Sequence, residues 1–446
     1  MKPQIINQSQ SEIFRNRLSN QIKPDHPMKI LADKISWVSV EEEYAKLFDD
    51  GSKGGRPASP VRLVVGLLLL QYLHDLSDEA VCESWVENPY WQYFCGYDFL
   101  QWELPLDPSS LSRWRGRLGK EKLEQILKLT VKAGVDTGTV TKKDMEEVTV
   151  DTTVMPKHVT FPTDSKLLNK SRDRLVKLAK KKNVPLRQNY NKVTKKLSWQ
   201  IGGYLHAKQM KRATAAIKKM KTITGRVVRD LERKIDKNAE LKEVFKEELE
   251  KAYRLLNQTK TAKNKLYSLH EPYVECIAKG KARTRYEFGC KAGFTTTNKK
   301  GKDFILGASA FHGNPYDGHT LQESITLAEK MTETKIKDIF VDNGYKGHDL
   351  NLEEGSKTVW FSRQRRGVTK LIRKKIKRRQ AIEPHFGHMK TEGKLGRCRL
   401  WGKAGDEAHA LLVAAGYNMR LILNHLKDLL LPVFWILFIG KIISLE

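Results

Sequence analysis

The sequence has 446 residues, enough for two or three domains with at least one well-buried core. Its 81 lysines and arginines against 52 aspartates and glutamates leave a formal net charge of +29, which points to a polyanionic partner, most commonly nucleic acid, with a membrane surface as the alternative. No apolar run reaches the ~20 residues that a membrane-spanning helix needs, and the five cysteines, without CxxC spacing, argue against a disulfide scaffold and a zinc cluster.

The first third of the chain has a helical pattern. Residues 1–30 are polar and aperiodic, so we expect a flexible arm, followed by an all-α N-terminal domain over residues 31–135. Ser59-Pro60 and Asp107-Pro108 each predict a helix that begins with proline at its first position. The second of these helices carries Arg113, Arg115 and Arg117, which is compatible with a helix-turn-helix-like DNA-binding module or with an ordinary bundle that has a solvated face.

The middle of the chain changes character twice. Residues 143–154, KDMEEVTVDTTV, alternate β-branched and polar side chains, which is typical of a strand. Residues 166–279 then read as a basic helical insertion, a long hairpin between strand elements. Residues 166–270 hold 30 basic and 9 acidic side chains. Because the acidic side chains are too few to pair with most of the basic ones, DNA contact is favoured over a hairpin that is merely solvated.

Strand patterns return in the last third of the chain, at RYEFGCKAGFTTT, KDFILGASAFHG, IKDIFVDNG and TVWF. A helix near 320–331, a very basic helix through Glu383 and a final helix ending in RLILNHL complete the pattern. This order predicts an α/β domain assembled from residues 143–165 and 280–427, with an apolar C-terminal tail at 428–446 that packs or lies at an interface.

Three carboxylates stand out by context. Asp151 lies in an apolar strand, where a charge is costly unless it is paired or binds metal. Asp342 ends a strand before a glycine turn, and α/β sheets bind ligands at the carboxyl ends of their strands. Glu383 is surrounded by cations. Taken singly, a strand-end aspartate is more often a turn cap and a glutamate among lysines a helix salt bridge. Together, the three carboxylates could hold two Mg²⁺ ions, roughly 4 Å apart, at a scissile phosphate.

The segments VDTTVM, GNPYDGHTL, FVDNGYKG and IEPHFGHMKTEGKLGRCRLWGKAGDEAHALLVAAGYNMRLIL resemble bacterial insertion-sequence transposases of the DDE class. The resemblance is closest to the family named after insertion sequence five and covers roughly residues 30–425. It implies an RNase H-like catalytic domain, a mixed sheet with flanking helices. Asp151, Asp342 and Glu383 would then be the catalytic, metal-binding triad, with Mg²⁺ or Mn²⁺, in two copies, as cofactor.

The same resemblance implies a Tyr, an Arg and a Lys around the glutamate. Arg379 and Lys390 fit this pattern, whereas Ile376 stands at the tyrosine position, which puts a hairpin-forming variant of the reaction in doubt. Arg379 and Lys390, with the three arginines of the N-terminal domain, are the expected DNA contacts. The expected partners are double-stranded DNA, both transposon terminal inverted repeats and target, and a second copy of the chain, with no membrane. The expected location is the bacterial cytoplasm, at the nucleoid.

Several alternatives stay open at this stage. Asp317 could replace Asp342 as the second aspartate, although it falls in a loop. Trp199, Trp360 and Trp401 could each stack on a base or be buried in a core. His312, His319, His385 and His388 lack zinc spacing and read as packing or DNA-proximal residues. A nuclease of the same fold that does not transpose, or an inactive DNA-binding protein derived from a transposase, remain rival functions.

Overall fold

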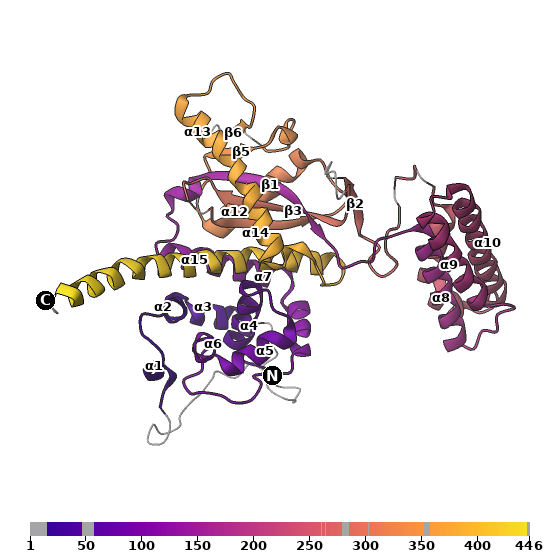
Figure 1. Cartoon of the computed structure of the whole chain (residues 1–446), viewed down its shortest axis with the longest axis horizontal. Helices are drawn as coiled ribbons and strands as arrows, with labels where there is room; N and C mark the ends of the chain where they lie inside the picture. Colours follow the sequence, from indigo (N-terminus) through magenta and orange to yellow (C-terminus); the bar gives the residue numbers. More distant parts are fainter. Residues whose placement is uncertain are drawn as a thin grey trace. The chain divides into compact units, whose positions relative to one another are not determined.

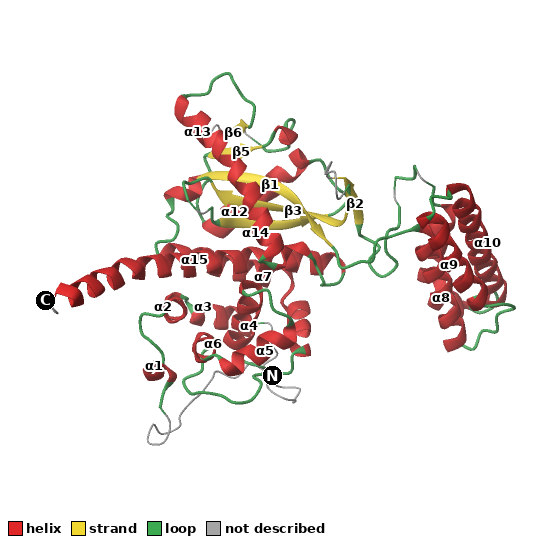
Figure 2. Ribbon diagram, in the orientation of Figure 1, coloured by secondary structure: helices red, strands yellow, loops and turns green. Residues whose placement is uncertain are grey.

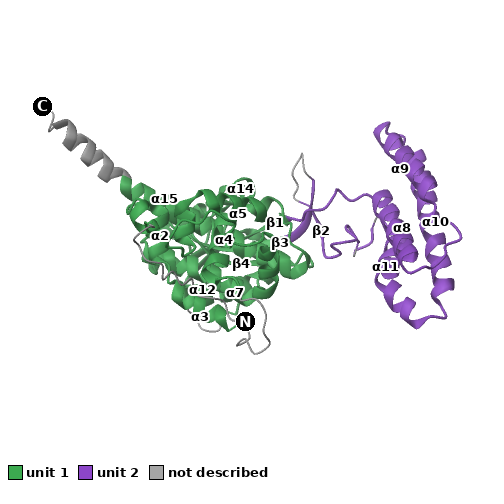
Figure 3. Ribbon diagram, turned by 90° about the horizontal axis from the view of Figure 1, so that it is seen from below, with its two compact units in different colours: residues 1–155, 291–446 green, residues 156–290 purple. Residues whose placement is uncertain are grey.

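The computed structural model describes residues 16–46, 58–259, 261–263, 265–278, 285–301, 303–351 and 357–443, with side chains as far as residue 430. The chain divides into two compact units (Figure 3). Unit 1 comprises residues 1–155 and 291–446, and unit 2 comprises residues 156–290. The boundaries fall within two strands, so unit 2 is an insertion into the chain of unit 1.

Helices form the first part of unit 1 (Figure 1). They are α1 (Leu18–Gln21), α2 (Pro27–Lys34), α3 (Trp37–Ala45), α4 (Val61–Leu73), α5 (Asp78–Glu87), α6 (Pro89–Phe94) and α7 (Ser109–Asp136). The expectation of a flexible arm at 1–30 is wrong for residues 16–30, because Leu18, Ile22 and Met28 are buried and anchor α1 and α2. Residues 1–15 lie outside the described part.

The two Pro-containing helix starts differ from the prediction by one residue. Pro60 and Pro108 are the N-cap residues of α4 and α7, and each helix begins at the residue after the proline. Asp107 still caps locally, since its Oδ1 accepts the N–H of Ser109 at 2.9 Å. The helix α7 is kinked at Gly119, whose φ of 64° lies in a region that glycine adopts readily.

A mixed six-stranded sheet lies at the centre of the structure's α/β part (Figure 2). Its strands are β1 (Glu147–Pro156), β2 (Glu275–Ala278), β3 (Tyr286–Thr297), β4 (Ile305–Phe311), β5 (Asp338–Val341) and β6 (Thr358–Phe361). The order is β2-β3-β1-β5-β6, and β4 also pairs with β3. The strands β3 and β4 are antiparallel, whereas β1, β5 and β6 run parallel. The α/β fold class is confirmed, and only the short β2 escaped the sequence patterns.

The helices that follow β4 surround the sheet. They are α12 (Leu321–Thr332), α13 (Lys370–Arg378), α14 (Ile382–Thr391) and α15 (Gly402–Ile443). The basic helix expected through Glu383 is interrupted by a 3-10 segment, η4 (Arg379–Ala381). The expected apolar tail continues α15 as helix to Ile443. None of the helices in the described part of the chain combines the length and the apolar character that a membrane crossing requires.

The long helix α15 ties both parts of unit 1 into one core. It packs against α7 and α4 on one side and against β4 of the sheet on the other (Figure 1). Asn418, fully buried on α15, accepts the N–H of Ile305 at 2.9 Å and donates to Thr130 Oγ1 of α7 at 3.2 Å. The N-terminal helices and the sheet therefore share one compact unit, where the sequence had suggested separate domains.

The described residues of unit 2 form four helices, where the sequence predicted a helical hairpin. They are α8 (Asp164–Lys181), α9 (Asn191–His206), α10 (Met210–Ile235) and α11 (Ala239–Asn257). The apolar side chains that the charged pattern concealed form two clusters, one around Met220 and Ile223 and one around Leu231 and Phe245. Unit 2 therefore has a hydrophobic core of its own.

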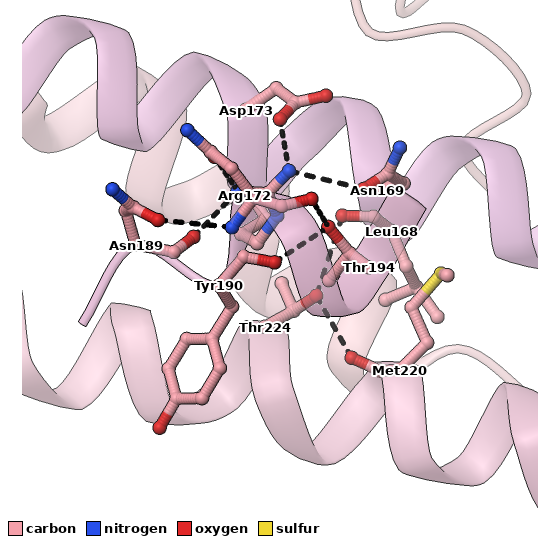
Figure 4. Close-up of polar contacts among 10 residues, drawn as sticks. Leu168, Asn169, Arg172, Asp173, Asn189, Tyr190, Thr194, Met220 and Thr224 are labelled. Carbon is pink, nitrogen blue, oxygen red and sulfur yellow. Dashed lines mark hydrogen bonds and ion pairs between the residues drawn. The ribbon is translucent and has the colours of Figure 1, made fainter. Parts of the chain in front are cut away.

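A buried arginine fixes the connection between α8 and α9 in unit 2 (Figure 4). Arg172, 2% exposed, donates to the carbonyl of Asn189 at 2.6 Å and to Asn169 Oδ1 at 3.2 Å, and it pairs with Asp173. These bonds satisfy the two terminal nitrogens of the buried guanidinium, which would be costly to leave unpaired, and they tie the loop to α8. The loop ends at Tyr190, in the left-handed region.

Candidate active site

Strand register brings Asp151 and Asp342 together. Val148 and Thr149 of β1 lie opposite Ile339 and Phe340 of β5 in parallel pairing. Two residues further along each strand, the same register sets Asp151 beside Asp342. The pairing of β5 with β6, in which Val341 lies opposite Phe361, likewise sets Asp342 beside Ser362. Side chains at equivalent positions of parallel neighbours project from the same face, so three polar groups meet at one edge of the sheet.

One arginine bridges the two aspartates. Arg379 donates from one guanidinium nitrogen to Asp151 Oδ2 at 3.1 Å, and its other terminal nitrogen lies 3.6 Å from Asp342 Oδ1. The Arg379 side chain is 7% exposed, against 19% for Asp151 and 52% for Asp342. The structure therefore places Arg379 inward, on the carboxylates, and not on an open helical face with Glu383 and Lys390.

The two aspartates differ electrostatically. Burial raises the pKa of Asp151 to about 6, against the opposing effect of Arg379 and with further increase from the charges of Asp342 and Asp317. Burial also acts to raise the pKa of Asp342, but hydrogen bonds from Ser362 Oγ (2.7 Å) and the Asn343 N–H outweigh it, and this pKa lies below its ordinary value. The negative charge of the two aspartates therefore exceeds the single positive charge of Arg379.

Asp317 lies in a hydrogen-bond network next to this pair. It is the first residue of the 3-10 segment η2 (Asp317–Thr320), and its Oδ1 accepts from Thr152 Oγ1 at 2.8 Å and from Lys291 Nζ at 2.9 Å. Tyr345 is buried nearby, and its pKa lies well above the ordinary value because of burial and the charges of Asp151 and Asp317. Asp317 thus adjoins Asp151 through Thr152, and Asp342 occupies the position beside Asp151.

Glu383 stands in the first turn of α14, four residues after Arg379. At the rise of helical backbone, its Cα is about 6–8 Å along the chain from that of Arg379. It is exposed, and no described residue forms an ion pair with it. The solvated Arg379–Glu383 pair that the spacing allowed is not formed, because Arg379 pairs with the aspartates instead.

The other expected DNA contacts are dispersed over unit 1. Arg113 and Arg117 are exposed on α7. Arg115 is not open to a phosphate in this state, because its guanidinium, 8% exposed, pairs with Asp78 of α5 at 2.5 Å. Lys390 lies at the far end of α14 from Glu383 and is half-buried.

Two residues of the site escaped the sequence patterns. Ser362 follows β6 as Asp342 follows β5, so a strand-end search extended to hydroxyl side chains would have found it. Lys291 lies within a strand, where its pairing with Asp317 across 26 residues has no local sequence signal.

The donor set suits a divalent cation. Hard carboxylate oxygens are the ligands Mg²⁺ prefers, and here oxygens of Asp151 and Asp342 already converge on one cationic group. Among the described side chains, Asp151, Asp342 and Glu383 do not all come within 4.8 Å of one another. An ion between the aspartates would therefore replace the Arg379 guanidinium.

Comparison with known proteins adds three findings. Residues 16–117 match the model of the family described as Transposase domain (DUF772), and residues 346–423 match that of the family described as Transposase DDE domain. A protein of Rhizobium meliloti named "Uncharacterized protein ORF8 in nfe locus" is 43% identical over 209 residues, which is 47% of this chain and 100% of that protein. No solved structure matches the chain. The second family match includes Arg379, Glu383 and Lys390.

Proposed function

The chain belongs to the transposases that combine the DUF772 domain with a DDE domain, a combination typical of the insertion-sequence-five family, and we propose that it cuts DNA at the inverted-repeat ends of a transposable element and joins them to target DNA. The observation that carries this proposal is the parallel register that sets Asp151 beside Asp342, with both on one cationic group. Glu383, from the segment that matches the DDE domain, would complete the triad.

The strand order supports an RNase H-like fold for this domain. The strand β3 pairs with β1 on one side and with β4 on the other, and β5 and β6 follow on the far side of β1, parallel to it. The first carboxylate lies on the central strand and the second follows the adjacent parallel strand. This arrangement brings catalytic groups together at one sheet edge, as open α/β sheets do for their ligands.

Asp151, Asp342 and Glu383 would hold two Mg²⁺ or Mn²⁺ ions. When bound, such ions lower the pKa of the attacking hydroxyl and stabilise the leaving oxygen. The chain itself orients the carboxylates: the Thr152 N–H holds Asp151 at 2.8 Å, and Ser362 Oγ holds Asp342 at 2.7 Å. Arg379 lies against both aspartates in the metal-free protein and offsets part of their charge, and it would become available to a DNA phosphate once displaced.

The reaction proceeds in two displacements. In the first, water oxygen bonds to phosphorus at the element's end and the bond from phosphorus to the 3′-oxygen breaks, which leaves a free 3′-hydroxyl. In the second, that hydroxyl attacks a phosphodiester of the target and releases a target 3′-oxygen. Because two ends must join one target, we propose that the active complex contains two copies of the chain on double-stranded DNA.

The test of this function uses the full chain and the DNA that flanks its coding region. We expect nicks at the boundaries of imperfect inverted repeats in Mg²⁺, and their complete loss in EDTA, as seen by primer extension on supercoiled plasmid. Joined products on a second plasmid separate transposition from a nuclease that does not transpose. Cleavage with no preference for the repeats, or activity that persists in EDTA, would contradict the proposal.

Unit 2 is the proposed clamp on duplex DNA. The outward stripe of α10 carries a series of exposed cations, and α9 adds three more lysines; the cations are Lys211, Lys218, Lys219, Arg226, Arg229, Lys192, Lys195 and Lys196. Lysines of α11 instead form ion pairs with acidic side chains, such as Lys251 with Glu247. Exposed cations that have no ion pair among the described residues thus lie on α9 and α10, and also on α8 at Lys166, Lys177 and Lys180.

Replacing Lys195, Lys196, Lys218 and Lys219 with glutamine should flatten the salt dependence of duplex binding. Each phosphate contact contributes about 0.9 to the slope of log K against log salt, so the loss of four contacts lowers the slope by roughly 3–4. Fluorescence anisotropy of a labelled duplex at several KCl concentrations measures this slope.

A matched control removes four lysines that already have acidic partners. Lys234, Lys242, Lys246 and Lys251 pair with Asp230, Asp236, Glu243 and Glu247. Their fourfold glutamine variant should keep nearly the original slope. Equal slopes for both variants and the unmodified protein would make unit 2 a structural insertion.

A further inference from the structure

A cleft of about 970 Å³ lies in unit 1, at the opposite end of α14 from Glu383. One wall is formed by α7, the end of α4 and the start of α5. The other wall is formed by the segment between Lys390 and His409. Seven residues of α-helix separate Glu383 from Lys390, which corresponds to about 10 Å. A DNA strand at the carboxylates could therefore reach the cleft within a few nucleotides.

The segment after α14 directs alternate side chains into this cleft. Arg397, Arg399 and Trp401 are exposed, with 73% of the Trp401 side chain open, whereas Cys398 is fully buried. Alternation of this kind is what an extended backbone produces. Two arginines and an indole therefore share one face of a short extended segment.

This segment is held rigidly against its neighbours. A Cβ at Gly396 would lie 2.5 Å from the carbonyl oxygen of Lys390, and one at Gly405 would lie 2.9 Å from the backbone of Leu400. Cys398 Sγ lies 3.3 Å from the buried Asp406 Oδ1. The close packing of backbone on backbone fixes the positions of the exposed side chains, which lowers the entropy lost on binding.

The charges lining the cleft are partly neutralised, and its cations outnumber its acidic side chains, which include Glu79. Arg115 pairs with Asp78 at 2.5 Å and Lys120 with Glu407 at 2.6 Å. Within the described part of the chain, Arg397 and Arg399 have no ion-pair partner. The cleft thus presents two uncompensated guanidinium groups beside an exposed aromatic ring.

The opposite wall is open at the backbone. A Cβ built at Gly116 or at Gly119 of α7 would meet nothing within 4 Å, and both glycines line the cleft. The kink at Gly119 turns α7 where it faces the arginine segment. A ligand can therefore approach the α7 backbone closely at this point.

We propose that this cleft binds a few unpaired nucleotides of single-stranded DNA, with Trp401 stacked on a base and Arg397 and Arg399 on phosphates. Arginines that follow a backbone beside an aromatic platform are the general chemistry of single-strand binding. Of the three tryptophans considered from sequence, Trp360 is committed to the sheet, where its indole donates to Asp338 at 2.7 Å, and Trp199 belongs to unit 2. This inference rests on the proposed transposase function, since it assigns the strand next to the cut.

Anisotropy with a labelled single-stranded oligonucleotide of about ten nucleotides tests the proposal with the full chain in EDTA, where metal binding plays no part. The variant Trp401→Ala should bind roughly tenfold or more weakly, since base–aromatic stacking is worth 1–3 kcal/mol per base, with its salt slope unchanged. The double variant Arg397→Gln, Arg399→Gln should lower the slope by about 1.4, at 0.7 per single-strand phosphate.

Controls make the outcome decisive. Trp401→Phe should restore most of the affinity, and Trp102→Ala, another exposed tryptophan (65%) that does not line the cleft, should bind like the original chain. Unchanged single-strand affinity in Trp401→Ala, or equal competition by polyglutamate, would overturn the proposal. If Trp401→Ala loses single-strand affinity but the unmodified chain never cuts repeat DNA, the result supports single-strand binding in the cleft. The same result refutes the transposase function.

Discussion

Replacing Asp342 with asparagine is expected to lower Mg²⁺-dependent cleavage at the element's ends by roughly 10³-fold or more, because a metal-bound carboxylate supplies several kcal/mol of transition-state stabilisation. Asparagine keeps the shape of the side chain and can still accept from Ser362 Oγ. Duplex binding should therefore stay within about twofold, since phosphate contacts elsewhere supply it. Single-turnover cleavage and anisotropy on the same repeat-containing duplex measure the two quantities.

The control for this variant is Asp349→Asn. Asp349 is an exposed aspartate in the same loop after β5, and its Oδ1 accepts the N–H of Gln322 at 3.3 Å. This variant should cut at nearly the original rate. Full activity in Asp342→Asn would refute the metal site, and equal losses in both variants would point to a disturbed loop.

Replacing Arg379 with glutamine is expected to separate two roles of that residue. In EDTA at pH 7.5 the free energy of unfolding should fall by about 1–3 kcal/mol, less than for a fully buried ion pair because Asp342 is half exposed. The Kd for Mn²⁺ should fall several-fold, because the guanidinium no longer competes for the aspartates. Cleavage should fall as well, through the lost phosphate contact. Denaturant unfolding and Mn²⁺ titration followed by electron paramagnetic resonance measure the first two effects.

The destabilisation should also depend on pH. The pKa of Asp151 is about 6, above its value in an unfolded chain, so the protein binds a proton there as the pH falls through that value. A protonated Asp151 no longer needs a cation. The cost of Arg379→Gln in EDTA should therefore be smaller at pH 5 than at pH 7.5.

Arg378 provides the matched control. It is the preceding residue and pairs with buried Asp303 at 3.1 Å, away from the two aspartates. Arg378→Gln should destabilise the protein equally with and without Mg²⁺, whereas Mg²⁺ should reverse most of the loss in Arg379→Gln. If Mg²⁺ changes the free energy of unfolding of both variants equally, Arg379 forms a purely structural ion pair and does not occupy the place of a metal.

The sequence allowed Asp151 and Asp342 to be selected because their signal is local. A charge in an apolar strand and an aspartate at a strand end can be read within ten residues, and the register then makes them neighbours. The inward role of Arg379 could not be read, because helical spacing predicted one continuous face. The 3-10 segment η4 interrupts that face and turns Arg379 toward the sheet.

Ile376, which the sequence already placed where related transposases are expected to have a tyrosine, is 7% exposed and packs as an apolar residue of α13. Other misses have the same physical origin in contacts between distant residues. In unit 2, the charge pattern concealed Leu231 and Phe245, whose burial depends on helices far apart in sequence. The N-terminal helices and the sheet share one core through α15, whose contacts with α4, α7 and β4 join residues far apart in the sequence and leave no local pattern.

The position of α15 also governs how the protein can be made. This helix supplies the surface that α4, α7 and β4 share, so during translation the N-terminal helices emerge without the partner that completes their core. The apolar surfaces of these helices therefore stay exposed to solvent until more than 400 residues have left the ribosome. A frameshift or premature stop before α15 should therefore give an insoluble or degraded product, not a partly active one that could still occupy the element's ends.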